Sequence, residues 1–242
     1  MGEVIAVASG KGGTGKSTVC AAVASALALE GKAVLCIDCD AGLRNLDLAL
    51  GISDLDALSF ADVLSGNYHI NQAIQHPSLE YLRFLTAPVN WHWSQSNEKA
   101  FEKMLIKAKK KYQYIFLDAP SGLGAGFQIT AKWADQVMLV TLAEAAAIRN
   151  TARAAEELEK MGKTDLHLVI NRVDQKKLAR MKLTVDDIMD ETGVRLLGLV
   201  PEDNGAVSAA AGKTPLKIKK GAAAACRRIA RRLQGISEPI GI

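Results

Sequence analysis

Several features that place a chain in a membrane or a secretory pathway are absent from this sequence. No run of about 18 consecutive apolar residues occurs, so the sequence predicts no transmembrane helix. The chain starts on a predicted strand and lacks the charged region and apolar segment of a signal peptide. We therefore expect a cytoplasmic protein.

Cysteine is scarce, and its spacing indicates neither disulfides nor a zinc finger. Cys36 and Cys39 form a C-x-x-C pair at the end of an apolar segment, which invites a redox or metal interpretation. No second Cys or His pair follows at zinc-finger spacing. We favour buried small side chains for all four cysteines. They are Cys20, Cys36, Cys39 and Cys226.

Strand-like and helix-like segments alternate along the chain, which is typical of parallel βαβ units. With 242 residues and 49% hydrophobic content the chain can bury one large core, and no linker, repeat or low-complexity tract interrupts it. The predicted fold is α/β: a single doubly wound, mostly parallel sheet flanked by helices, in one domain over residues 1–242. Such sheets bind ligands at the carboxyl ends of their strands.

The expected elements can be stated by residue range. Strands are predicted over residues 3–9, 33–37, 81–86, 112–117, 136–141, 165–170 and 195–200. Helices are predicted over residues 17–29, 97–111, 143–161, 185–192, 204–211 and 219–233, with short helices and turns over 57–75.

Residues 10–18, the phosphate loop, directly follow the apolar run 4–8 and match the pattern G-x-x-x-x-G-K-[ST]. Glycines let the backbone N–H groups turn inward around phosphate oxygens, Lys16 reaches the β- and γ-phosphates, and the Ser17 hydroxyl ligates Mg²⁺. The helix that follows directs its positive end at the anion. We predict a nucleotide site formed by Gly10, Lys11, Gly12, Gly13, Thr14, Gly15, Lys16, Ser17 and Thr18.

A second lysine, Lys11, lies early in the phosphate loop, where an ordinary loop of this kind needs no charge. From the outer arm of the loop its side chain cannot easily turn back onto the chain's own phosphate. It could reach the phosphate of a facing subunit, as an arginine finger supplied in trans does. The alternative is a solvated surface lysine, but the position among the glycines favours a functional role.

Three aspartates stand at predicted strand ends. Asp118 closes the apolar run 114–117, where a carboxylate can hold Mg²⁺ through the ion's hydration shell. Taken alone it could equally be a helix cap, but a phosphate loop in the same chain favours the metal. Asp38 and Asp40 are two apart and therefore face the same side. Residues 119–126, the switch segment, are rich in glycine, and we expect them to move with the nucleotide state.

Two of these motifs resemble a known family. K-G-G-T-G-K-S-T at residues 11–18 resembles the deviant Walker A motif of the MinD/ParA ATPases. D-C-D-A-G-L-R-N-L-D at residues 38–47 is similar to the switch I segment of the MinD branch. The resemblance runs from residue 3 to about residue 233.

The resemblance implies an enzyme that hydrolyses ATP to ADP and phosphate with Mg²⁺ and forms a homodimer with ATP, in which Lys11 crosses the interface. It implies that Asp40 orients the attacking water and that Asp38 supports the magnesium site. The process implied is septum placement in cell division. A ParA-like ATPase of DNA segregation or flagellar placement is an alternative, and a nucleotide-binding adaptor without hydrolysis is another.

The base pocket is predicted from two segments at carboxyl ends of strands. Asn171 and Arg172 follow the predicted strand 165–170. In the family an Asn here reads the purine edge, because its amide both donates and accepts. Pro201, Glu202 and Asp203 resemble the other wall of this pocket. Two turn-forming segments are the structural alternative.

The C-terminal region bears on partners. The resemblance implies a MinC- or MinE-like regulatory partner and peripheral contact with the inner face of the cell membrane. The apolar stripe of helix 219–233 holds no Phe or Trp, so we expect a packed helix rather than a membrane anchor. The chain has a net charge of +4, but no aromatic residues interleave with its C-terminal basic residues, which favours a solvated face over DNA binding. These basic residues are Lys213, Lys217, Lys219, Lys220, Arg227, Arg228, Arg231 and Arg232.

Overall fold

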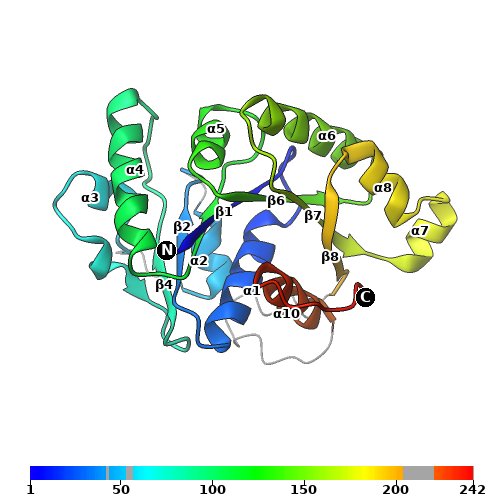
Figure 1. Ribbon diagram of the computed structural model, residues 1–242, viewed down its shortest axis with the longest axis horizontal. Helices are drawn as coiled ribbons and strands as arrows, with labels where there is room; N and C mark the ends of the chain where they lie inside the picture. The colour runs from blue at the N-terminus through cyan, green and yellow to red at the C-terminus, as the bar shows by residue number, and fades with distance from the viewer. Residues whose placement is uncertain (42–43, 53–56, 204–220, 242) are drawn as a thin grey trace.

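The computed structural model describes residues 1–41, 44–52, 57–203 and 221–241 (Figure 1). The strands are β1 (Glu3–Ala8), β2 (Val34–Asp38), β3 (Ile74–Gln75), β4 (Leu82–Leu85), β5 (Tyr114–Asp118), β6 (Gln136–Leu142), β7 (Leu166–Val173) and β8 (Arg195–Pro201). The helices are α1 (Lys16–Leu29), α2 (Asn45–Leu50), α3 (Phe60–Leu64), η1 (Ile70–Gln72), α4 (Gln95–Lys109), α5 (Ala125–Lys132), α6 (Ala145–Lys160), α7 (Gln175–Met181), α8 (Val185–Thr192) and α10 (Gly221–Leu233).

The strands form one sheet in the order β3-β4-β2-β5-β1-β6-β7-β8. Neighbouring strands are parallel, except that β3 runs antiparallel to β4 at the edge. The strands β2 to β5 lie on one side of β1 in the sheet, and β6 to β8 lie on the other side. The direction of the connections therefore reverses at β1. The predicted doubly wound α/β fold is confirmed.

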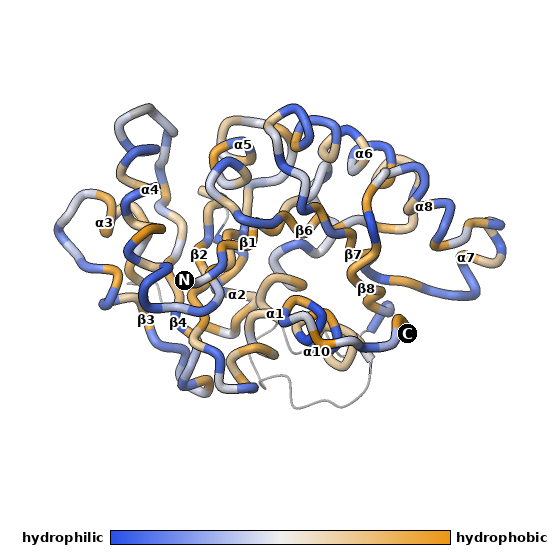
Figure 2. The backbone as a smooth tube through the Cα atoms, in the orientation of Figure 1, coloured by the Kyte–Doolittle hydropathy of each residue, from blue (hydrophilic) through white to orange (hydrophobic). Residues whose placement is uncertain are grey.

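Two hydrophobic clusters cover the two faces of the sheet. Because successive side chains of a strand point to opposite faces, Ile5 and Val7 of β1 pack with α1, α2 and α10, whereas Val4 and Ala6 pack with α4, α5, α6 and α8. Figure 1 shows these helices on opposite sides, and Figure 2 shows the strands between them mostly in the apolar colour. All four cysteines are buried and free, as predicted.

The predicted elements are mostly observed, with differences in the short ones. The helices α2, α5 and α7 and the two-residue strand β3 were not predicted. All four elements are short. The helix α7 has no buried side chain, so no apolar periodicity predicts it. The one local signal for α7 is Asp174, whose side chain caps the helix by accepting from the backbone N–H groups of Lys176 and Lys177. The helix predicted over 204–211 lies outside the described residues.

The last predicted helix packs as α10 on α1 and β8, through Ala225, Cys226 and Ile229. Its arginines are engaged within the chain. Arg227 pairs with Glu30 at 3.3 Å, and Arg232 donates to the backbone carbonyl of Leu197 at 2.6 Å. Three of the four arginines also contact the segment that follows α10.

The C-terminal segment folds back along α10. Arg228 donates to the carbonyl oxygen of Gly241 at 2.6 Å, Arg231 pairs with Glu238, and Arg232 donates to the carbonyl oxygens of Glu238 and Pro239. In the described part of the chain, no helix is both long enough and apolar enough to cross a membrane.

Candidate nucleotide-binding site

The phosphate loop lies at the carboxyl end of β1, where the direction of the connections reverses. Two of its glycines take left-handed backbone angles, Gly13 with φ of 81° and Gly15 with φ of 84°. A Cβ at Gly10 would lie 2.1 Å from the carbonyl oxygen of Asn150 in α6, and one at Gly15 would lie 2.3 Å from Asn171 Nδ2 in β7. The loop is therefore confined between α6 and β7, and only glycine fits at these two places.

The helix α1 begins at Lys16, directly behind the loop, with Gly15 as its N-cap. The unpaired N–H groups of a helix N-terminus and the helix dipole both favour a bound anion. Of the loop residues, Lys11, Gly12, Gly13 and Thr18 are exposed. The backbone N–H donors and the exposed residues of the loop therefore lie together at the carboxyl end of β1, as a phosphate-binding loop requires.

Lys16 is the buried cation of the site. Its Nζ lies 2.6 Å from Asp118 Oδ1, and the two side chains are 7% and 0% exposed. Burial lowers the pKa of Lys16, but the nearby groups, Asp118 first and then Asp40, together outweigh burial, so the pKa is raised and the ammonium stays charged. Asp118 reaches Lys16 because β1 and β5 are neighbours in the sheet, with Val7 opposite Asp118.

The other two aspartates lie beside this pair. Asp38 is opposite Asp118 in the register of β2 and β5 and is fully buried. Its carboxylate accepts from the backbone N–H of Asp40 at 2.9 Å and of Leu46 at 3.2 Å, which ties it to the start of α2. Burial, followed by the nearby Asp118 charge, raises the pKa of Asp38 to about 7. Burial also raises the pKa of Asp40.

The donor set fits a hydrated magnesium ion. Among the described residues, Asp118 Oδ2 is buried without a hydrogen-bond partner, which is costly unless a ligand uses it. Magnesium prefers oxygen ligands and keeps several of its waters. Three carboxylates face one buried lysine here, so a cation offsets their repulsion, and the half-buried Ser17 in the first turn of α1 adds a hydroxyl.

Lys11 differs from Lys16 in its surroundings. Its side chain is exposed, while its backbone carbonyl accepts from Ser9 Oγ at 3.0 Å. The backbone of the loop is thus fixed at Lys11, and the charge is presented to solvent. The site holds one lysine inside the chain and one on its surface.

The predicted base-pocket residues lie at the carboxyl ends of β7 and β8. The strand β7 extends to Val173, with a register shift against β8 after Ile170, so Asn171 and Arg172 lie inside the strand and not after it. Asn171 Nδ2 donates to the carbonyl oxygen of Thr14 at 2.8 Å, a contact with the phosphate loop.

The second predicted wall begins at the end of β8. Pro201 is the last residue of β8. Asp203 Oδ2 accepts from the backbone N–H of Ala222 at 3.2 Å, at the start of α10. Asp203 therefore contacts a helix N-terminus, where a carboxylate is stabilising, while Glu202 lies in a cleft.

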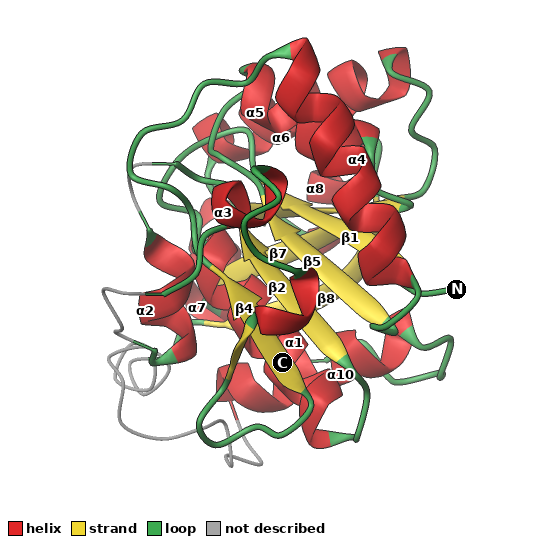
Figure 3. Ribbon diagram, turned by 90° about the vertical axis from the view of Figure 1, so that its left-hand side faces the viewer, coloured by secondary structure: helices red, strands yellow, loops and turns green. Residues whose placement is uncertain are grey.

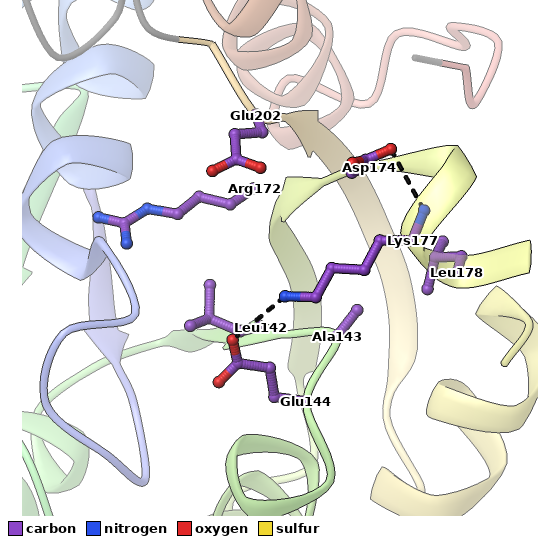
Figure 4. Close-up of a pocket in the computed structure, with 8 residues that line it drawn as sticks. All are labelled: Leu142, Ala143, Glu144, Arg172, Asp174, Lys177, Leu178 and Glu202. Carbon is purple, nitrogen blue, oxygen red and sulfur yellow. Dashed lines mark hydrogen bonds and ion pairs between the residues drawn. The ribbon is translucent and has the colours of Figure 1, made fainter. Parts of the chain in front are cut away.

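A cleft of about 110 Å³ brings Glu202 and Arg172 together at the carboxyl ends of β6, β7 and β8. Figure 4 shows these two side chains at one end of it and the pair Lys177–Glu144, 3.6 Å apart, at the other. The cleft is lined by Leu142, Ala143, Glu144, Arg172, Asp174, Lys177, Leu178 and Glu202. Sequence reasoning missed Lys177 and Asn150, since no motif marks either one.

Comparisons with known proteins agree with this geometry. A family described as AAA domain matches residues 2–170. The septum site-determining protein MinD of Synechocystis sp. is 34% identical over 245 residues, covering 99% of this chain and 92% of the relative. A chain of the MinC:MinD cell division protein complex of Aquifex aeolicus matches with a TM-score of 0.90 at 34% identity, covering 99% of this chain and 98% of that one.

A further solved structure, the septum site-determining protein MinD of Pyrococcus horikoshii complexed with Mg-ADP, matches with a TM-score of 0.82 at 29% identity, covering 96% of each chain. The strand order and the phosphate loop define a P-loop nucleotide hydrolase. Within that class the chain belongs to the MinD/ParA family of ATPases, as its motifs predicted.

The buried position of Lys16 leads to a binding prediction. Lys16→Ala should weaken the binding of Mg·ADP on the order of 100-fold, because hydrogen bonds to a charged group contribute up to about 3 kcal/mol. Titration calorimetry measures this affinity, at a temperature where circular dichroism shows the variant folded. Lys99→Ala, an exposed lysine on α4, is the matched control. Equal affinity in the two variants would remove Lys16 from the site.

Proposed function

We propose that this chain is a MinD-like ATPase, a switch that dimerises with ATP and hydrolyses it with Mg²⁺ to ADP and phosphate in the placement of the division septum. The observation that carries the proposal is the difference in burial between the two lysines of the phosphate loop. Lys16 is buried against Asp118, and Lys11 is exposed. The names of the relatives, septum site-determining proteins, support the process.

The proposed roles follow from the position of each group. Lys16 leaves Asp118 for the phosphates when ATP binds, because the phosphate oxygens offer the ammonium a stronger anion. Asp40, half-buried beside Lys16, orients the attacking water. A bound Mg²⁺ held by Ser17, Asp38 and Asp118 supplies charge neutralisation at the phosphates. Phosphoryl transfer needs mostly positioning and charge stabilisation, so these groups suffice.

Lys11 supplies the link between hydrolysis and dimerisation. Its exposed charge takes no part in the buried Lys16–Asp118 pair. In a dimer whose phosphate loops face each other, Lys11 reaches the phosphates bound by the partner subunit. The transition state then gains a cation only when both subunits hold ATP. A switch of this design hydrolyses slowly as a monomer and faster in the assembled dimer.

We propose residues 1–242 as one ATPase domain, supported by two core clusters on the two faces of one sheet. The chain works in the cytoplasm and at the inner face of the membrane. A regulatory partner of the MinC or MinE kind is supported by the similarity to the MinC:MinD complex. The arginines of α10 are engaged within the chain, which favours a protein partner over nonspecific DNA. Lys213, Lys217, Lys219 and Lys220 lie outside the described residues.

The cross-subunit role of Lys11 can be tested by light scattering. Lys11→Ala should bind Mg·ATP with an affinity within about threefold of the original, yet lose ATP-dependent dimerisation and activated hydrolysis, because a charge donated in trans can contribute 10³-fold or more. Lys99→Ala should dimerise normally. Dimer formation by Lys11→Ala would reject the role and leave a monomeric phosphate-loop protein.

Asp40 is expected to act in the chemical step alone. Asp40→Ala should still bind ATP and dimerise, but its turnover number should fall by about 100-fold or more, since only the attacking water loses its partner. Phosphate release at saturating ATP measures this, with Asp190→Ala on the exposed side of α8 as the control. Turnover equal to that of the control would show that Asp40 does not orient the water.

A further inference from the structure

Four aromatic side chains, here called the aromatic cluster, gather beside the switch segment. Phe60 comes from α3 and Phe101 from α4, while Trp91 and Trp93 come from the connection between β4 and α4. Figure 1 shows α3 and α4 on its left-hand side, and Figure 3 shows both helices on the side that then faces the viewer. The proposed function gives these tryptophans no role.

Trp93 is the member that the others hold in place. Its ring stacks on Phe60 with centroids 5.8 Å apart and an interplanar angle of 8°. It meets Phe101 edge-on at 5.2 Å and Trp91 edge-on at 5.5 Å. Phe60 and Phe101 are fully buried, so they cannot move without disturbing the core. The two buried phenylalanines therefore fix the ring, in the stacked and edge-to-face geometries that aromatic pairs prefer.

The indole edge of Trp93 faces the end of the switch segment. A Cβ at Gly126 would lie 3.2 Å from Trp93 Nε1 and 2.5 Å from Pro120 Cγ. Gly126, in the first turn of α5, is thus enclosed between the indole of Trp93 and Pro120, the second residue of the segment. A side chain at this position would force one of the two to move.

The other part of the switch segment contacts the nucleotide site. The N–H of Ala119 donates to the carbonyl oxygen of Val7 at 3.0 Å, and that of Gly122 donates to Ser9 at 3.3 Å. Ser121 Oγ lies 3.7 Å from where a Cβ of Gly12 would be. Asp118, the partner of Lys16, directly precedes the segment. One run of contacts therefore leads from the phosphate loop through residues 119–126 to Trp93.

We propose that Trp93 is a positioning residue for ATP hydrolysis, fixing the distal end of the switch segment while the proximal end responds to nucleotide. This inference rests on the proposed function. When Lys16 leaves Asp118, the segment is released at Asp118 and held at Gly126, so it pivots about the point where Trp93 contacts it. Nucleotide binding uses the phosphate loop and does not need this pivot. Hydrolysis does, because the segment borders the reacting phosphate.

The kinetic test compares two tryptophans of one cluster. Trp93→Leu should lower the turnover number for ATP about tenfold and leave KM within about twofold, since small misplacements near a reacting group reduce the rate of chemistry. Trp91→Leu, which contacts Phe60 and Trp93, should lower the melting temperature similarly and keep at least half of the turnover. Trp93→Phe, which keeps a ring against Phe60, should recover most of it. Equal losses in both leucine variants would overturn the proposal.

A spectroscopic test does not depend on turnover. The chain has three tryptophans, so Trp91→Phe together with Trp133→Phe leaves Trp93 as the only one. Its emission should differ between the free protein, Mg·ADP and Mg·AMPPNP, and adding Gly126→Ala should remove the difference between the two nucleotides. A fluorescence emission of Trp93 that does not change when nucleotide binds would overturn its role. Wild-type protein that binds ATP without hydrolysing it would overturn the proposed function instead, while the emission still reports on Trp93.

Discussion

The buried ion pair between Lys16 and Asp118 is the interaction on which the rest of the site depends. Two charges removed from water cost several kcal/mol each, and only a close partner offsets that cost. The 2.6 Å contact therefore ties the first residue of α1 to the last residue of β5. Because β1 and β5 are neighbours, the same pair fixes where the phosphate loop begins its turn toward α1.

The pair also sets the charge balance that a nucleotide must change. In the free protein the ammonium of Lys16 is used by Asp118, and Asp38 has a pKa raised to about 7 by burial and by Asp118. Burial therefore disfavours the charged form of Asp38. A magnesium ion held by Asp38 and Asp118 would favour the carboxylate form of Asp38, and the phosphates would give Lys16 a new partner. Metal and nucleotide therefore act on the same group of charges, which makes the site a switch as well as a binding site.

Short, local sequence patterns were sufficient to predict some parts of this site. The phosphate loop and Asp118 at the end of an apolar run each need only a few adjacent residues to be recognised, and the α/β alternation needs only the periodicity of successive segments. The base pocket stays a prediction, and the contacts of its residues are tertiary ones that no local pattern records: Asn171 donates to Thr14, and Asp203 caps α10. No local pattern records that Gly10 faces Asn150 or that Gly126 faces Trp93. Those constraints arise only when helices and loops from distant parts of the chain pack together.

We infer that Lys16 exchanges Asp118 for the phosphates of ATP. A crystal structure of this protein with Mg²⁺ and AMPPNP would show this exchange. We expect Lys16 Nζ within about 3 Å of phosphate oxygens, no longer in contact with Asp118, and Asp118 directed at the metal's water shell. A nucleotide bound elsewhere, with the Lys16–Asp118 contact intact, would contradict it.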